Sequence, residues 1–239
     1  GQAIIVAREP LTVCGILLAE EAFGQLSAEA NFQTRIEDGH ELSTGDTILE
    51  IKAPCRALLT AERTALNYLQ RLSGIATQAA DYVGAVRGTG VLILDTRKTT
   101  PGWRAFEKYA VQCGGARNHR RGLDDLIMIK DNHLAALETL NPVAGAVARA
   151  HEAAPDLKVE VEADTLEQAE AAAAAGADII LLDNMTLEML RDAVALIDGR
   201  SQIEASGGIT LESVRAVAET GVNFISVGAL THSAAAADI

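Results

Sequence analysis

Two different rhythms of apolar and polar residues run along the chain, and they change near residue 60. Before it, short strand-like runs at residues 3–7, 13–17 and 47–51 are separated by turn signals rich in Gly, Asp and Ser. Thr60 is a suitable N-cap, and leucines at helical spacing predict a helix from Ala61 to about Val86, with Gly74 as the place for a bend. The N-terminal region is therefore expected to be a small sheet followed by a long helix.

From residue 91 onward, short apolar runs alternate with capped amphipathic helices. The expected strands cover residues 91–94, 126–129, 158–161, 179–182, 202–205 and 224–227. Thr165 and Gln168 form a capping-box signature for one intervening helix, and Thr210 is the expected cap of another. This alternation is typical of parallel β/α units that close toward a barrel.

Composition narrows the class further. With 239 residues, of which 49% are hydrophobic and 22% charged, the chain can bury the core of one or two domains. A net charge of -13 argues against nucleic acid as a partner, and no apolar stretch has the length of a membrane span. The three cysteines form no C-x-x-C pair, which indicates a reducing compartment. We therefore expect a cytoplasmic protein with no nucleic-acid or membrane partner.

One segment reverses the acidic balance of the chain. Between Arg97 and Arg121 lie seven of the 20 Lys and Arg residues, with Glu107 as the only acid. A solvated basic face is the ordinary explanation for such a run. However, Arg97 and Lys98 directly follow an expected buried strand, and a basic site in that position captures negatively charged small molecules. The segment therefore favours an anion-binding site.

The residues that follow the expected strands fall into two kinds. The first four strands end in charged or polar side chains, at Asp95 to Lys98, Lys130 to His133, Glu160 with Glu162, and Asp183 with Asn184. The last two end in Ser206-Gly207-Gly208 and Gly228-Ala229. Glycines at such junctions let backbone N–H groups approach a phosphate, and barrel enzymes place their active sites at these strand ends. The pattern favours a phosphorylated substrate.

A resemblance to one family rests on stretches spread over the whole chain. They are Thr60–Asn67, Ser73–Thr77, Asp95–Gly102, Lys108–Val111, Cys113–Gly122, Ile129–His133, Leu181–Asn184 and Ser226–Ser233. These stretches closely resemble nicotinate-nucleotide pyrophosphorylases, also called quinolinate phosphoribosyltransferases. The resemblance implies a pentosyltransferase that moves phosphoribosyl from phosphoribosyl pyrophosphate to quinolinate with decarboxylation, giving nicotinate mononucleotide for NAD synthesis. It also implies Mg²⁺ and a homodimer with shared active sites.

The same resemblance implies the fold. Residues 1–88 should form an α/β sandwich domain with a connecting helix, and residues 89–230 an incomplete seven-stranded α/β barrel. Residues 231–239 should pack back on the first domain. The periodicity shows six strands of the seven, so we expect the seventh near residues 113–119.

The resemblance also implies roles for individual residues. Quinolinate should be bound by Thr96, Arg97, Lys98, His119, Arg120 and Lys130, with Arg63 reaching in from the neighbouring subunit. Glu162 and Asp183 should face the ribose and hold Mg²⁺, directly or through water, and a share for Glu160 stays open. The phosphate should be cradled by Ser206, Gly207, Gly208, Val227, Gly228 and Ala229. The expected catalytic residues are Lys98, Lys130, Glu162 and Asp183, and which lysine assists decarboxylation stays open.

Some features depart from the family, and other interpretations compete with it. The chain looks shorter than the family at both ends, and Ala116 replaces a usual glycine. A relative associated with molybdenum transport would share the fold with a different substrate. An aldolase-like barrel would use Lys98 or Lys130 as a Schiff-base amine. The turn from Asp38 to Ile48 is superficially similar to that of a lipoyl-type carrier domain.

Overall fold

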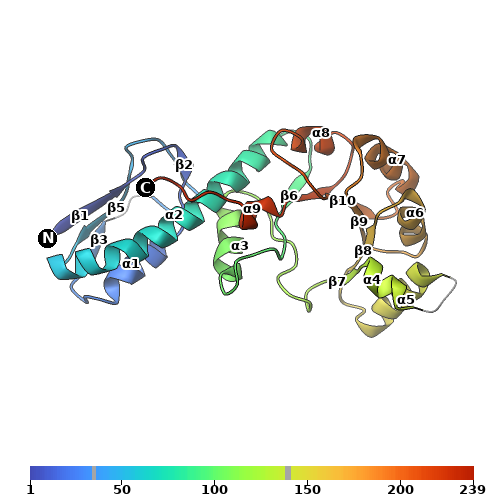
Figure 1. The fold of residues 1–239 in the computed structure, drawn as a ribbon, viewed down its shortest axis with the longest axis horizontal. Helices are drawn as coiled ribbons and strands as arrows, with labels where there is room; N and C mark the ends of the chain where they lie inside the picture. Colours follow the sequence, from blue (N-terminus) through green and yellow to red (C-terminus); the bar gives the residue numbers. More distant parts are fainter. Residues whose placement is uncertain (34–35, 138–140) are drawn as a thin grey trace. The chain divides into compact units, whose positions relative to one another are not determined.

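The computed structural model describes residues 1–33, 36–137 and 141–239, which form two compact units (Figure 1). The first unit contains Gly1–Val83, Lys98–Asn118 and Gly228–Ile239. The second contains Gly84–Arg97 and His119–Val227. Segments far apart in the sequence therefore share the first unit. The expected domain boundary between residues 88 and 89 stays a prediction.

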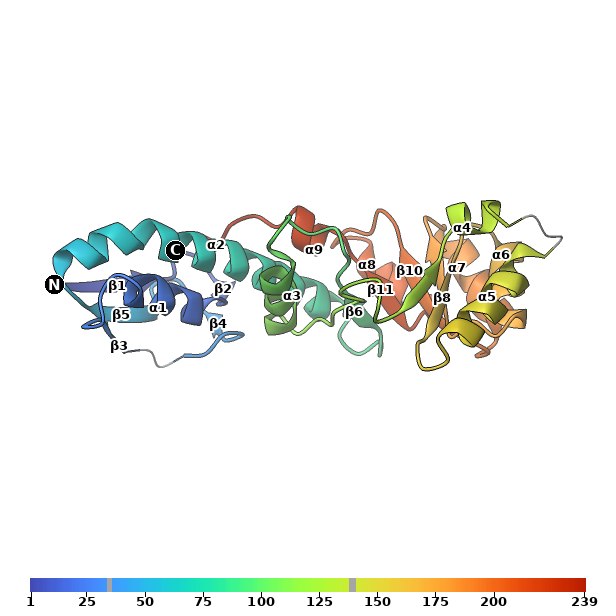
Figure 2. The ribbon, with the colours of Figure 1, turned by 90° about the horizontal axis from the view of Figure 1, so that it is seen from below.

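An antiparallel sheet of order β1-β5-β3 forms the N-terminal part of the first unit. Its strands are β1 (Gln2–Val6), β5 (Thr47–Lys52) and β3 (Asn31–Gln33), and a short ladder joins β2 (Leu11–Thr12) to β4 (Glu41–Leu42). Helices α1 (Ile16–Gly24) and α2 (Cys55–Ala85) lie along this sheet (Figure 2). Alternation along β5 buries Leu49 and Ile51 in a core shared with both helices. The strands expected at residues 3–7 and 47–51 are confirmed to within a residue.

The strand expected at residues 13–17 is wrong, because helix α1 begins inside it. Gly15 has a φ of 102°, a left-handed conformation that turns the chain into the helix. The carboxylate of Asp38 then accepts the N–H groups of Gly15 and Ile16 at 2.9 and 3.0 Å. This long-range cap replaces a local capping side chain, and apolar periodicity carries no signal of it.

Helix α2 starts earlier than the sequence pattern suggests. The carbonyl of Pro54 accepts the N–H groups of Ala57 and Leu58, so the first turn is already formed before Thr60. The Thr60 hydroxyl instead donates to the Arg56 carbonyl at 2.8 Å, within the helix. The cap expected at Thr60 is therefore wrong, while the helix itself and its end near residue 86 are confirmed.

Gly74 lies within a single helical element and allows a close backbone approach there. A Cβ at this position would lie 1.9 Å from the carbonyl oxygen of Ala235, so only glycine lets the C-terminal segment pass. Ala237 donates its N–H to the Gln70 carbonyl at 2.9 Å, and Ile239 packs in the core of the N-terminal sheet. Helices α3 (Arg104–Cys113) and α9 (Ala229–His232) complete this unit.

The second unit is built on a parallel sheet of order β6-β11-β10-β9-β8-β7. Its strands are β6 (Leu92–Leu94), β7 (Ile127–Ile129), β8 (Val159–Ala163), β9 (Ile179–Asp183), β10 (Gln202–Ser206) and β11 (Phe224–Ser226). Its helices are α4 (Asp131–Ala135), α5 (Pro142–Ala153), α6 (Leu166–Ala174), α7 (Leu187–Ile197) and α8 (Val214–Ala218). Figure 1 shows α5 to α8 along the outer side of the curved row of strands. The expected open β/α barrel is confirmed.

Two details of this unit differ from expectation, and one agrees. Thr165 and Gln168 form the capping box of α6, as expected. Helix α8 has Ser213 at its N-cap, because a turn separates Thr210 from the helix. Within the described part of the chain the sheet has six strands, and residues 113–119 contain only a single bridge residue, Arg117. Over the described ranges, none of the helices combines the length and apolar character needed to cross a membrane.

Candidate functional site

The parallel sheet of the second unit brings most of the candidate residues to one edge. Because all six strands run in the same direction, the residues after each strand meet at their carboxyl ends. Thr96 and Arg97 follow β6, Lys130 follows β7, and Val227 follows β11. Glu162 lies near the end of β8, Asp183 ends β9, and Ser206 ends β10. The expected grouping of these residues at the strand ends is therefore observed within this unit.

Arg97 and Arg120 form a pair of like charges in the second unit. Partial burial lowers the pKa of Arg120 below its ordinary value, and the positive charge of Arg97 lowers it further. The Arg120 guanidinium also contacts the Leu126 carbonyl at 3.3 Å and the Met128 sulfur at 3.4 Å. Two neighbouring guanidinium groups repel one another unless an anion bridges them, and their planar forks match a carboxylate. The arrangement suits a dicarboxylate.

His119 directly precedes Arg120 in the chain and lies against two buried acids. Its Nε2 is 3.2 Å from a carboxylate oxygen of Glu160 and 3.4 Å from one of Glu204, and both acids are buried within the sheet. Burial lowers the pKa of His119, but the two carboxylates outweigh it and raise this pKa to about 10. The Nδ1 atom accepts the N–H of Arg120 at 2.7 Å. A ring protonated on both nitrogens, as that pKa alone would give near neutral pH, could not accept this N–H, so we follow the hydrogen-bond geometry and assign His119 the tautomer with its proton on Nε2, facing the carboxylates.

Lys130 and Glu162 form an ion pair between neighbouring strand ends. Lys130 is the N-cap of α4, and its backbone N–H donates to His133 Nδ1 at 3.0 Å. Glu162 lies on β8 between β7 and β9, so it does not stand on an exposed edge of the sheet. Asp183 accepts a hydrogen bond from the Asn184 side chain at 2.7 Å. Both acids remain partly accessible, as ligands of a substrate or a metal must be.

At the glycine-rich end of β10, Gly207 has no room for a side chain. Gly207 and Gly208 have φ angles of 97° and 60°, and a Cβ on Gly207 would lie 2.2 Å from the Asn184 side-chain oxygen. Beside this loop is a cavity of about 250 Å³, lined by Ser206, the two glycines and apolar residues of α7 and α8. A larger cavity of about 460 Å³ is lined by residues of β1 and the start of α2, and none of the candidate residues lines it. Volume alone therefore does not locate the site.

Four candidate residues belong to the first unit. Arg63 is exposed on α2, and Lys98 is exposed in the segment that follows β6. Gly228 is the N-cap of α9, and Ala229 is its first residue. A Cβ on Gly228 would lie 3.2 Å from the Lys98 side chain and 3.1 Å from the His232 ring. Gly228 therefore allows the Lys98 stem to pack against the start of α9.

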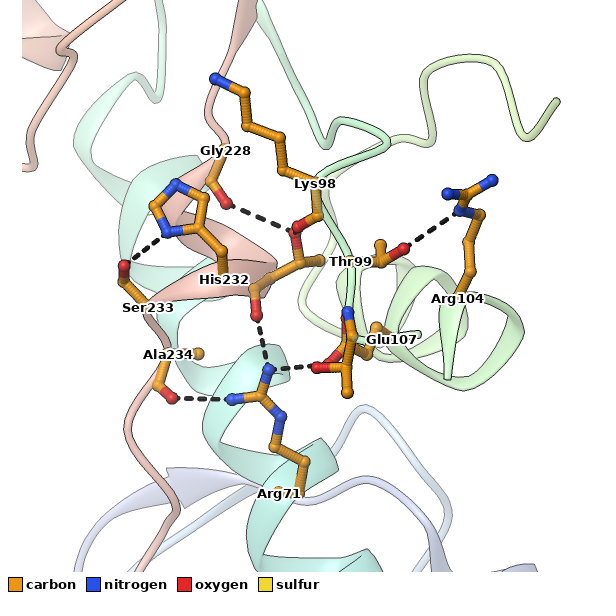
Figure 3. A network of polar contacts seen from close by, with 11 residues as sticks. Arg71, Lys98, Thr99, Arg104, Glu107, Gly228, His232, Ser233 and Ala234 are labelled. Carbon is orange, nitrogen blue, oxygen red and sulfur yellow. Dashed lines mark hydrogen bonds and ion pairs between the residues drawn. The ribbon is translucent and has the colours of Figure 1, made fainter. Parts of the chain in front are cut away.

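A network of polar contacts fixes the backbone around Lys98 (Figure 3). The Thr231 hydroxyl donates to the Lys98 carbonyl at 2.8 Å. The buried carboxylate of Glu107 accepts the backbone and side-chain groups of Thr100 at 3.0 and 2.8 Å. Arg71 closes the network by donating to Glu107 at 2.7 Å and to the carbonyls of Thr231 and Ala234. The expected roles of Arg63 and Lys98 stay predictions, but the segment carrying Lys98 is firmly held.

Sequence reasoning missed four of these residues. Arg71 and Glu107 lie on separate helices with no linking motif, and Asp95 appeared only as a member of a strand-end stretch. Asp95 is buried and accepts the backbone N–H of His119 at 2.8 Å. Glu204 was hidden within an apolar strand. An acid in such a run is itself a signal, because buried strands of parallel sheets are normally apolar throughout.

Comparison with known proteins matches nearly the whole chain to the two domains of one family. Residues 1–73 match the model of the quinolinate phosphoribosyl transferase N-terminal domain, and residues 75–239 match that of the C-terminal domain. The nicotinate-nucleotide pyrophosphorylase [carboxylating] of Mycobacterium leprae is 46% identical over 98% of this chain and 84% of its own length. The probable enzyme of Bacillus subtilis is 45% identical over 100% of this chain and 82% of its own length.

Solved structures agree with the sequence comparison. NadC from Streptococcus pyogenes superimposes with a TM-score of 0.94 at 46% identity, covering 99% of this chain and 83% of that one. The nicotinate-nucleotide pyrophosphorylase from Francisella tularensis gives the same TM-score at 40% identity. With both family domains matched in order, and with basic, acidic and glycine-rich strand ends in one sheet, the chain belongs to the quinolinate phosphoribosyltransferase family.

Proposed function

We propose that the protein is a carboxylating nicotinate-nucleotide pyrophosphorylase of NAD biosynthesis. It transfers phosphoribosyl from phosphoribosyl pyrophosphate to quinolinate and releases pyrophosphate and CO₂, leaving nicotinate mononucleotide. The observation that carries this proposal is the grouping at the carboxyl ends of one parallel sheet, where Glu162 and Asp183 lie in the same unit as the arginine pair Arg97 and Arg120. The pair supplies planar donors for a dicarboxylate, and the acids supply charge for the ribose end.

Quinolinate recognition is assigned to the basic side of the site. Arg97 and Arg120 bind its two carboxylates, with Thr96, Lys98, His119 and Lys130 as further ligands. Planar guanidinium forks can bind each carboxylate through two parallel hydrogen bonds, which ammonium groups cannot do. The lysines add charge near the carboxylate that departs.

Phosphoribosyl transfer is assigned to the acidic side. The pyridine nitrogen of quinolinate forms a bond to the ribose anomeric carbon while the bond from that carbon to pyrophosphate breaks. Glu162 and Asp183 stabilise the positive charge that develops on the ribose. The phosphate of the ribose binds to Ser206, Gly207, Gly208, Val227, Gly228 and Ala229, whose small side chains leave backbone groups accessible.

The donor set of Glu162 and Asp183 fits magnesium. They lie on neighbouring parallel strands, and Glu162 pairs in register with Leu181, two residues before Asp183, so both project from one face. Carboxylate oxygens are the ligands that Mg²⁺ prefers, and it usually keeps several waters. When bound there, Mg²⁺ would neutralise the pyrophosphate oxygens. Lys130, which is ion-paired with Glu162, holds that carboxylate in place.

Decarboxylation then requires orientation more than acid chemistry. Ring ribosylation makes the nitrogen a pyridinium, which accepts the electron pair left on the adjacent carbon when the bond to CO₂ breaks. A proton then adds to that carbon. Lys98 and Lys130 supply positive charge near this centre. The protein must hold the ring still and keep water out until CO₂ has left.

The assembly and location are part of the same proposal. A homodimer with shared sites gives Arg63 a role, because its guanidinium would complete the quinolinate site of the partner chain. We place the enzyme in the cytoplasm. The Schiff-base alternative is weaker for Lys130, because its Nζ is held in an ion pair with Glu162.

The direct test is synthesis of nicotinate mononucleotide by the purified protein. Quinolinate, phosphoribosyl pyrophosphate and magnesium should give the nucleotide, pyrophosphate and CO₂ in equal amounts. Nicotinate in place of quinolinate should give no comparable rate, because it lacks the second carboxylate. Borohydride trapping with a carbonyl substrate should leave no lysine adduct. No nucleotide from quinolinate under any magnesium concentration would contradict the proposed function.

A further inference from the structure

Two buried acids beside His119 have no place in the reaction as assigned above. Glu160 on β8 and Glu204 on β10 come from the strands that flank β9, and both side chains are almost fully buried. Their carboxylate oxygens converge on His119 Nε2 at 3.2 and 3.4 Å. They therefore form, with His119, a buried cluster next to Arg120 in the chain.

The two acids are costly for the fold. Apart from their ion pairs with His119, none of their four carboxylate oxygens has a hydrogen-bond partner over the ranges that the structure describes. Buried polar groups are normally hydrogen-bonded, and an exception in a folded protein calls for an explanation such as a functional role. Apolar residues of similar volume would pack in the sheet at a lower cost in free energy. The stability of the unit therefore does not explain these residues.

The segment that contains His119 and Arg120 depends on side-chain contacts for its conformation. His119 and Arg120 lie outside every helix and strand, so no backbone ladder sets their conformation. Asp95 accepts the His119 backbone N–H at 2.8 Å, and His119 Nδ1 accepts the Arg120 N–H at 2.7 Å. The ring orientation of His119 is thus coupled directly to the backbone of Arg120.

We propose that Glu160 and Glu204 are positioning residues for quinolinate recognition, acting through the His119 ring to hold Arg120. They draw the Nε2–H of His119 into the sheet, so that Nδ1 stays turned toward the Arg120 N–H. The guanidinium is then held beside Arg97 before the substrate arrives, which reduces the entropy lost on binding. This inference rests on the proposed function, because it takes Arg120 as a quinolinate ligand.

Positioning and simple electrostatics predict opposite results for Glu204→Gln. The substitution removes negative charge below an anion site, so electrostatics alone would tighten quinolinate binding. Loss of positioning should instead raise the KM for quinolinate about tenfold, with kcat and the KM for phosphoribosyl pyrophosphate near wild type. Glu204 is the better probe because it lies on β10, whereas Glu160 shares β8 with Glu162. The variant should fold, because the neutral amide has nearly the same volume as the carboxylate and costs less to bury.

The experiment combines kinetics with ¹⁵N NMR of histidine-labelled protein. The wild type should show His119 with Nε2 protonated and Nδ1 unprotonated, and Glu204→Gln should populate the other tautomer. Glu152→Gln, an exposed substitution with the same charge change, should leave the tautomer and both KM values unchanged. Unchanged or lower quinolinate KM in a folded Glu204→Gln would overturn the inference, as would a protonated Nδ1 in the wild type. An inactive wild type would contradict the proposed function instead, and the tautomer would still be measurable.

Discussion

The two units each contain a cluster of buried charge, and the clusters differ in how well they are satisfied. In the first unit, both oxygens of Glu107 accept hydrogen bonds, and Arg71 bonds two backbone carbonyls besides. In the second unit, Glu160 and Glu204 face His119 without a hydrogen bond among the residues described. A cluster whose charged groups are all hydrogen-bonded holds the backbone in place. An unsatisfied one raises the free energy of the folded state, and it is most easily understood as serving the site above it.

This difference distinguishes residues that stabilise the fold from residues proposed to bind and convert the substrates. The Arg71 network joins α2, α3 and α9 around the backbone of Lys98, so its charges are all used within the fold. In the second unit, Arg97, Lys130, Glu162 and Asp183 lie at strand ends, and the like charge of Arg97 acts on Arg120 in the loop before β7. We expect substitutions in the first cluster to lower stability, and substitutions in the second unit to change binding or rate with little loss of stability.

The largest effect should come from Arg71→Met. It leaves the Glu107 carboxylate buried without its counter-charge, and breaking such a pair costs about 3–5 kcal/mol of unfolding free energy. Chemical denaturation measures this cost. Arg200→Met removes an arginine from an exposed pair with Glu170 and should change stability far less. Equal losses in the two variants would mean that the buried pair is no more structural than a surface one.

The second effect tests the acids at the strand ends. Asp183→Asn and Glu162→Gln should each lower kcat by on the order of 10²- to 10³-fold, because they remove negative charge where the ribose becomes positive. Quinolinate affinity and unfolding free energy should change little. Steady-state kinetics over a range of magnesium concentrations checks this, with the exposed Asp192→Asn as the matched control. Near-normal kcat in both variants would remove these acids from the ribose end.

The sequence was sufficient for features that depend on local pattern. The order of strands and helices in the second unit follows from apolar runs and caps such as Thr165 with Gln168. The basic, acidic and glycine-rich strand ends were also predicted, because a parallel sheet brings them to one edge. The start of α1 was missed because its cap, Asp38, lies more than 20 residues away in the sequence. The buried clusters were missed for the same reason, since only the folded chain brings Arg71 to Glu107, or Glu204 to His119.

A smaller effect tests the arginine pair without changing its charge. Arg97→Lys and Arg120→Lys should each weaken quinolinate binding by about 1–3 kcal/mol, because an ammonium cannot replace a bidentate guanidinium. Calorimetric titration measures the change, and Arg191→Lys on the exposed face of α7 is the matched control. Unchanged affinity in both variants would remove the pair from the quinolinate site, and the second unit would lose the feature that most distinguishes it from the first.

The last prediction, a partial recovery of activity, asks whether Arg63 of the first unit contributes to the active site of the partner chain. Arg63 is exposed on α2, far along the chain from the strand ends that carry the other proposed ligands, and the proposed dimer gives it a role in the partner's site. Arg63→Ala and Lys130→Ala should each be inactive alone. When mixed under exchange conditions, they should regain roughly a quarter of wild-type activity, because half of the dimers are hybrids and each hybrid has one site with both residues intact. Native mass spectrometry can confirm that hybrids form, and mixing each variant with itself is the control. No recovery despite exchange would mean that Arg63 serves its own chain or only the fold, and the first unit would then be a scaffold in this respect as well.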